Sequence, residues 1–248
     1  MDASLFQPGL QLQDFLHKMA IDKAITALLM DRPIPKDNLY WKGQTCYLDG
    51  KVRFLSIPFW LQLCSQNGYS LDVLLREDNL QIMEQILHYS EEEEQEQINW
   101  EQCIAKCCSI PALQQAAEKT PTLITELNTL VHHYPAYSSL RRGNFLIYHA
   151  LLFVQSKEEG LHLCHLLIDM IICGCVIDDL FDAHEDRLLG EENIILELGD
   201  DLDALNQVRT LFYASLNRLQ PYLPPIHSYL EYTFNQIIPH YLFHTMTP

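Results

Sequence analysis

The sequence contains few glycines and few cationic residues. Glycine accounts for 9 of the 248 residues, and Lys and Arg together for 16, against 33 Asp and Glu. The formal net charge of −17 argues against binding to nucleic acid or to anionic membrane surfaces, because both repel an acidic protein. No glycine-rich phosphate loop and no Gly-x-Ser-x-Gly nucleophile elbow occurs in the sequence. Together with the helical patterns described below, this excludes a dinucleotide-binding fold.

Signals for secretion, membrane insertion and zinc binding are also missing. The first residues, MDASLFQPG, lack the basic region and apolar core of a signal peptide. The longest apolar run, Leu166 to Ile177, is interrupted by Asp169 and is shorter than the roughly 20 residues that span a bilayer. The 8 cysteines lie mostly within helical patterns and lack the paired spacing of a zinc site. We therefore expect a cytoplasmic protein with reduced thiols and no membrane span.

Apolar residues recur with helical spacing along most of the chain, which predicts an all-α protein. One exception is residues 44–57, where two β-prone runs flank Asp49-Gly50, a pair typical of a type I′ turn, so a small hairpin is expected. A boundary near residue 110 would separate a helical region with the hairpin, 1–110, from a helix bundle, 111–248; the alternative is one continuous domain. The acidic run 91–97 is expected to be a solvated linker or an exposed helix face. Helices are expected at residues 10–30, 59–67, 70–90, 97–109, 111–118, 121–134, 137–156, 160–188, 202–220 and 224–244.

The helix expected at 160–188 ends in a cluster of carboxylates. Its middle is apolar on nearly every side, which is typical of a helix at the centre of a bundle. Asp178, Asp182 and Glu185 then follow on one face. Two carboxylates about 4 Å apart repel by roughly 1 kcal/mol in water and by about 4 kcal/mol at an effective dielectric constant of 20. Either cations neutralise the cluster, or some carboxylates stay protonated, or the cluster is solvated and paired with a neighbour such as Arg187. A hard cation such as Mg²⁺ would recruit a phosphorylated ligand to complete its oxygen shell.

The sequence Asp178-Asp179-Leu180-Phe181-Asp182 resembles the DDxxD motif of class I terpene synthases and the related prenyl diphosphate synthases. An apolar helix leads into the motif, and acidic residues follow it. The resemblance implies a helix bundle of the class I isoprenoid synthase type around an apolar cavity, with Mg²⁺ holding the diphosphate of a prenyl diphosphate substrate that is then ionised. By the same resemblance, the metal ligands are Asp178, Asp179 and Asp182, the diphosphate is bound by Arg141, Arg142 and Arg187, and the cavity is lined by Phe145, Tyr148 and Phe181.

The second metal motif of terpene synthases has no full counterpart in this sequence. The nearest candidate begins at Asp200, but Ala204 and Val208 stand where that motif has a hydroxyl residue and a Glu. An alternative function therefore stays open, namely a catalytically inactive helical scaffold or partner subunit with a degenerate synthase fold. Glu159-x-x-His162 resembles half of a di-iron site, but it lies too far from Asp182 along the same helix to share its metal. The sequence leaves a homodimer open.

Overall fold

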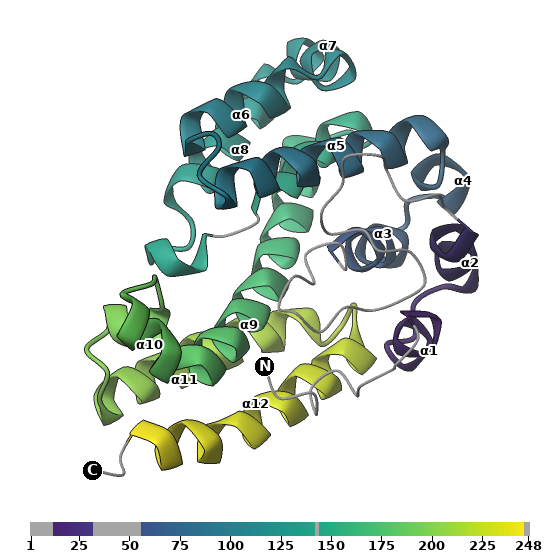
Figure 1. Cartoon of the computed structure of the whole chain (residues 1–248). Helices are drawn as coiled ribbons and strands as arrows, with labels where there is room; N and C mark the ends of the chain where they lie inside the picture. The colour runs from purple at the N-terminus through teal and green to yellow at the C-terminus, as the bar shows by residue number, and fades with distance from the viewer. Residues whose placement is uncertain (1–11, 32–55, 142–143, 246–248) are drawn as a thin grey trace. The chain divides into compact units, whose positions relative to one another are not determined.

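The computed structural model describes residues 12–31, 56–141 and 144–245, and every regular element in these ranges is helical (Figure 1). This confirms the all-α prediction. The predicted hairpin cannot be followed, because residues 44–55 lie outside the described ranges, while residues 56 and 57 begin a helix. The elements are α1 (Leu12–Lys18), α2 (Lys23–Asp31), α3 (Ser56–Gln66), α4 (Leu71–Leu74), α5 (Glu77–Glu94), α6 (Trp100–Ser109), α7 (Pro111–Lys119), α8 (Pro121–His133), the 3₁₀ helices η2 (Ser138–Leu140) and η3 (Asn144–Leu152), α9 (Lys157–Leu189), α10 (Ile194–Glu197), α11 (Leu202–Leu219) and α12 (Pro224–Thr245).

Most predicted helices are present, and four segments differ from the prediction. The helix expected at 70–90 is divided into α4 and α5. The helix expected at 10–30 is divided into α1 and α2, with Ala20 at a φ of 53° between them, a left-handed conformation that no α-helix contains. The segment expected to be α-helical at 137–156 forms the 3₁₀ helices η2 and η3 instead. Residues 145–150 are all buried, so their hydrophobic pattern has no period that would distinguish helix types. The four-residue helix α10 was not predicted.

The chain forms two compact units, and each unit combines two segments of the sequence. Of the described residues, the first unit, here called the N-terminal unit, contains 12–31, 56–132 and 144–167. The second, the C-terminal unit, contains the described residues 133–141 and 168–245. The boundary predicted near residue 110 stays a prediction.

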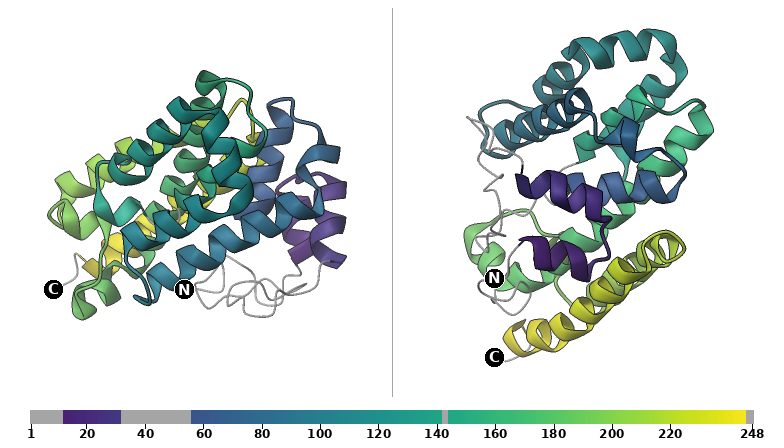
Figure 2. Two further views of the ribbon diagram at one scale, coloured as in Figure 1. Left: turned by 90° about the horizontal axis from the view of Figure 1, so that it is seen from above. Right: turned by 90° about the vertical axis from the view of Figure 1, so that its right-hand side faces the viewer.

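In the N-terminal unit, α5, α6 and α7 pack around η3. Helices α5 and α7 pack against η3, and α1, α2 and α3 pack in sequence beside one another (Figure 2). Trp60 of α3 is fully buried, as are Phe145 and Tyr148 of η3. Large aromatic side chains of this kind contribute much of the hydrophobic free energy of a core.

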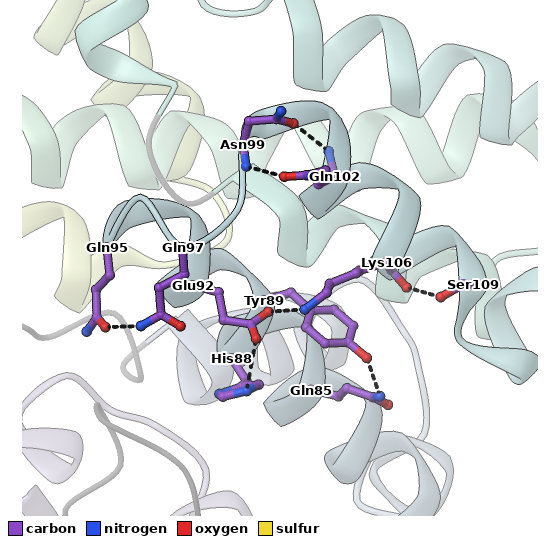
Figure 3. Close-up of polar contacts among 10 residues, drawn as sticks. All are labelled: Gln85, His88, Tyr89, Glu92, Gln95, Gln97, Asn99, Gln102, Lys106 and Ser109. Atoms are coloured by element: carbon purple, nitrogen blue, oxygen red, sulfur yellow. Dashed lines mark hydrogen bonds and ion pairs between the residues drawn. The ribbon is translucent and has the colours of Figure 1, made fainter.

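The acidic run at 91–97 joins α5 to α6, and its first residues take part in packing (Figure 3). Glu91 is buried, so the expectation of a fully solvated run is wrong for this residue, while residues 94–97 are exposed as predicted. Glu92 accepts a hydrogen bond of 2.5 Å from the Lys106 ammonium group of α6. Asn99 and Gln102 then form a reciprocal capping box that begins α6. The ion pair and the cap together fix the turn between the two helices.

The C-terminal unit contains the second half of α9 together with α10, α11 and α12. Phe212 of α11 and Phe234 of α12 stack with ring centroids 3.9 Å apart and planes 9° apart, which joins these two helices. The thiol of Cys173 on α9 contacts the carbonyl oxygen of Phe212 at 3.8 Å. The apolar stretch of α9 therefore forms part of the core, as its sequence predicts.

Helix α9 is also the one helix in the described ranges that is long and apolar enough to cross a membrane by length and composition alone. In its most apolar 18-residue window, 67% of the residues are buried inside the protein. The core helix of a soluble protein has the same properties, so this finding is weak evidence for a span. The absence of a membrane span stays a prediction.

Candidate functional site

The aspartates of the DDxxD sequence lie in the last turns of α9, but they have different environments. Asp178 and Asp182 are half-buried and lie one turn apart on the same face. Asp179 points in another direction and is only 1% exposed. A carboxylate at that depth requires hydrogen-bond donors, and the structure provides them.

The Asp179 carboxylate anchors α10. Its Oδ2 atom accepts a hydrogen bond of 2.7 Å from the backbone N–H of Ile194, the first residue of α10. The side-chain amide of Asn193 donates to the Asp179 carbonyl oxygen at 2.6 Å and to Asp186 Oδ2 at 2.7 Å. The Asn193 Oδ1 atom accepts from the backbone N–H of Ile195 and so caps α10. Two of the acidic residues of α9 therefore hold the chain segment that follows this helix.

Arg187, predicted to bind diphosphate, is engaged by an aspartate. Its Nε atom donates to Asp200 Oδ2 at 2.7 Å, and its guanidinium group forms an ion pair with the same carboxylate. The hydroxyl group of Tyr241 on α12 donates to Asp200 Oδ1 at 3.1 Å. Asp200 adopts a φ of 55°, a left-handed conformation that Asp tolerates better than most residues. Its neighbour Asp201 caps α11, because its Oδ1 atom accepts the backbone N–H of Ala204 at 2.8 Å.

The arginine pair Arg141-Arg142 was also predicted to bind diphosphate, and the structure describes Arg141. Arg141 donates through its Nε atom to the carbonyl oxygen of Pro135 and through Nη2 to that of Ala136, both at 3.2 Å. These bonds hold the loop that precedes η2. Arg142 lies outside the described ranges.

The three residues predicted to line a cavity are divided between the two compact units. Phe181 lies in the C-terminal unit and stacks on His240 with ring centroids 5.0 Å apart. Phe145 and Tyr148 belong to the N-terminal unit and are fully buried there. The Tyr148 hydroxyl donates to Asn128 at 2.7 Å, and burial raises the pKa of this tyrosine well above its usual value. A cavity shared by these residues stays a prediction.

Within the described ranges, no group of three or more His, Cys, Asp or Glu side chains is arranged to hold a metal ion. Mg²⁺ can bind with one or two protein carboxylates when waters and substrate phosphates supply the remaining oxygens. Asp178 and Asp182 could supply these two ligands, and Asp179 would have to release the N–H of Ile194 to become a third. The magnesium site stays a prediction.

An ion pair between a buried carboxylate and a half-exposed arginine joins α9 to α11, and the sequence alone did not indicate it. Asp169 is 1% exposed, and its two carboxylate oxygens accept hydrogen bonds from Arg218 Nε at 2.7 Å and Nη2 at 2.6 Å. The hydrogen bond to Asp169 raises the pKa of Arg218. Asp169 interrupts the longest apolar run of the sequence, and a lone carboxylate in such a run signals a buried partner.

His149 is a second buried polar residue with an unusual environment. Its Nδ1 atom accepts a hydrogen bond of 2.9 Å from the indole N–H of Trp60, so the imidazole is neutral and its proton is on Nε2. The Nε2 atom is buried without a hydrogen-bond partner in the described ranges. Burial lowers the pKa of His149 to about 3.

No protein-family model, curated protein or solved structure matches this chain. The resemblance to class I isoprenoid synthases therefore rests on the sequence around the end of α9.

Proposed function

We propose that the chain is a non-catalytic helical scaffold or partner subunit. The observation that carries this proposal is the engagement of the predicted site residues in contacts within the protein. The Asp179 carboxylate binds the N–H of Ile194, Arg187 pairs with Asp200, and Arg141 binds two backbone carbonyl groups. In a synthase these same groups would bind metal and diphosphate.

Converting these contacts into a catalytic site would be costly. A hydrogen bond to a charged group contributes about 1.5–3 kcal/mol, and a buried group left without its partner costs a similar amount. Withdrawing Asp179 from Ile194 would leave the first N–H of α10 buried without an acceptor. Withdrawing Arg187 would remove the cation that pairs with Asp200 and leave the hydrogen bond from Tyr241 in place. Each step opposes binding of Mg²⁺ or diphosphate.

The segment that most resembles a second metal motif, which begins at Asp200, also makes structural contacts. Asp200 holds Arg187, and Asp201 caps α11. A terpene synthase needs this second cluster to complete the cation set, so its use in folding supports the scaffold proposal.

A second candidate is a Mg²⁺-dependent synthase acting on a prenyl diphosphate, and one observation favours it. Asp178 and Asp182 are half-buried and lie one helical turn apart on one face of α9, and Mg²⁺ can bind with two protein carboxylates. In this candidate the two carboxylates bind Mg²⁺ and the cation holds the diphosphate as it leaves the allylic carbon.

Calorimetry and a release assay separate the two candidates. The protein is titrated with inorganic diphosphate in the presence and absence of Mg²⁺, and diphosphate release from farnesyl diphosphate is measured under the same conditions. For a scaffold we expect neither Mg²⁺-coupled binding nor release.

The matched variants are Asp178→Ala with Asp182→Ala, and Asp203→Ala as a control, since Asp203 is exposed in the first turn of α11. Mg²⁺-dependent release by the wild-type protein and the control variant, abolished by the double substitution, would overturn the scaffold proposal and establish the synthase.

A further inference from the structure

The exposed residues of helix α12 lie on one face and carry no charge. An α-helix turns by about 100° per residue, so the exposed positions of α12 fall within a sector of about 120° around the helix axis. We call this surface the α12 face. Among the side chains that the structure describes, it consists of Pro224, Ser228, Tyr232, Asn235, Gln236, Pro239 and Phe243.

The opposite side of α12 is held by the core of the C-terminal unit. Phe234 stacks on Phe212 of α11, and Tyr241 is buried and donates its hydroxyl group to Asp200. Ile237 is buried on the same side. These contacts fix the rotation of the helix about its axis, so the α12 face points away from the core that α12 and α11 share.

The lack of charge distinguishes α12 from the rest of this acidic chain. Its 22 residues contain one Asp, Glu, Lys or Arg, namely Glu231, whereas the 18 residues of α5 contain seven and the 18 residues of α11 contain three. Tyr232 is 66% exposed and Phe243 68% exposed. The central part of a protein–protein interface is typically enriched in aromatic residues and depleted of charged ones. The composition of the α12 face is therefore that of an interface.

The charge of the face indicates which partner it fits. A basic or an acidic partner would be recognised by the opposite charge, and the α12 face presents none. Two copies of this chain, each with a net charge of −17, repel each other wherever their carboxylates meet. One pair of like charges about 4 Å apart costs roughly 1 kcal/mol in water. The α12 face adds no carboxylate to such a contact, so it suits the approach of a second copy.

The spacing of the face also allows a two-fold contact with itself. Tyr232 and Phe243 are about 17 Å apart along the helix. Two antiparallel α12 helices, related by an axis at the level of residues 237 and 238, would place Tyr232 of each copy opposite Phe243 of the other. Pro239 has no N–H for the carbonyl oxygen of Asn235, and the exposed amide of Gln236 in the other copy could supply that hydrogen bond.

We propose that the α12 face is a two-fold interface between two copies of this chain. A helix of 22 residues is about 33 Å long and about 10 Å wide, so the face covers roughly 330 Å² per copy, against about 800 Å² in a standard interface. The dimer is therefore weak and forms at high protein concentration. This interface goes beyond the proposed function, since it does not depend on whether the chain is a scaffold or a synthase.

Sedimentation velocity tests the proposal at protein concentrations from roughly 5 to 500 µM. We expect the wild-type protein to be monomeric at the lowest concentration and partly dimeric at the highest. Added NaCl should not reduce the dimer fraction, because screening weakens the repulsion between the acidic chains and the face itself forms no ion pairs.

Matched variants locate the interface. Tyr232→Asp combined with Phe243→Asp places two carboxylates on the face of each copy and should raise the concentration needed for dimerisation by about tenfold or more. The control, Val73→Asp combined with Leu202→Asp, adds the same charge at exposed apolar residues outside α12 and should dimerise like the wild-type protein. Circular dichroism checks the helix content of each variant, and Tyr232→Ser with Phe243→Ser replaces the first variant if that content falls.

Three results would overturn the proposal. These are a wild-type protein that stays monomeric at every concentration, a dimer that the substitutions at Tyr232 and Phe243 leave unchanged, and a dimer that the control variant loses to the same extent. All measurements are made without Mg²⁺ and diphosphate. Failure of dimerisation is therefore distinct from failure of the scaffold proposal, which only Mg²⁺-coupled diphosphate binding or release would overturn.

Discussion

The buried histidine of the N-terminal unit predicts a specific dependence of stability on pH. The pKa of His149 is about 3 in the folded protein, against about 6.5 for an exposed histidine, because burial disfavours the charged imidazolium. Between these two values the unfolded chain binds a proton that the folded protein does not bind. The free energy of unfolding therefore rises with pH in this window and falls as the pH is lowered through it.

The size of the effect follows from the two pKa values. One pKa unit corresponds to about 1.4 kcal/mol, so lowering the pH from 7.5 to 5.0 should reduce the free energy of unfolding by about 2 kcal/mol through His149 alone. Protonation would also place a hydrogen on Nδ1, where Trp60 now donates its indole N–H, so that hydrogen bond would be lost. Urea denaturation followed by tryptophan fluorescence, at a series of pH values in this range, measures the change.

Two variants assign the pH dependence to this side chain. His149→Gln should be less stable at pH 7.5 because of altered packing, but most of the 2 kcal/mol fall toward pH 5.0 should disappear. His162→Gln, at an exposed position of α9, should keep the wild-type dependence. The reasoning is refuted if the wild-type protein is equally stable at pH 7.5 and 5.0, or if His149→Gln keeps the whole fall.

Two further predictions concern the C-terminal unit. Arg218→Leu should lower the free energy of unfolding by about 3 kcal/mol, the lower end of the range for a broken buried pair since Arg218 is partly exposed, and adding Asp169→Leu should restore most of this loss, as measured by urea denaturation. If the double variant were no more stable than Arg218→Leu alone, the buried carboxylate would not be the cause. Asn193→Ala should cost about 2–3 kcal/mol by removing a helix cap and two hydrogen bonds, and it should speed hydrogen exchange at the Ile195 amide, whereas Asn206→Ala, at an exposed position of α11, should change neither quantity.

Helix positions were predictable because their causes are local. Prolines at 111, 121 and 224 each stand at the first residue of a helix, where the missing N–H has no intrahelical partner. The apolar stretch of α9 identified the most buried helix, since a helix that is apolar on every side has no favourable position at the surface. The η3 segment was predicted with the wrong helix type because uniform burial leaves no hydrophobic period to read.

The roles of the charged residues were less predictable, because each role depends on a distant partner. The sequence places Asp178, Asp179 and Asp182 in one motif, but it does not indicate that Asp179 binds an N–H fifteen residues further along the chain. Nor does it pair Asp169 with Arg218, which follows it by 49 residues. Such partners are chosen by how the helices pack.

The sequence by itself determined that this protein is helical, that α9 is buried and that carboxylates gather at its end, since these properties follow from spacing and composition within one segment. Only the tertiary structure decided that Asp179 anchors α10, that Arg187 is paired with Asp200 and that Arg218 is paired with Asp169. The physical reason is that a carboxylate binds the donor nearest to it in space, and helix packing determines which residue supplies that donor.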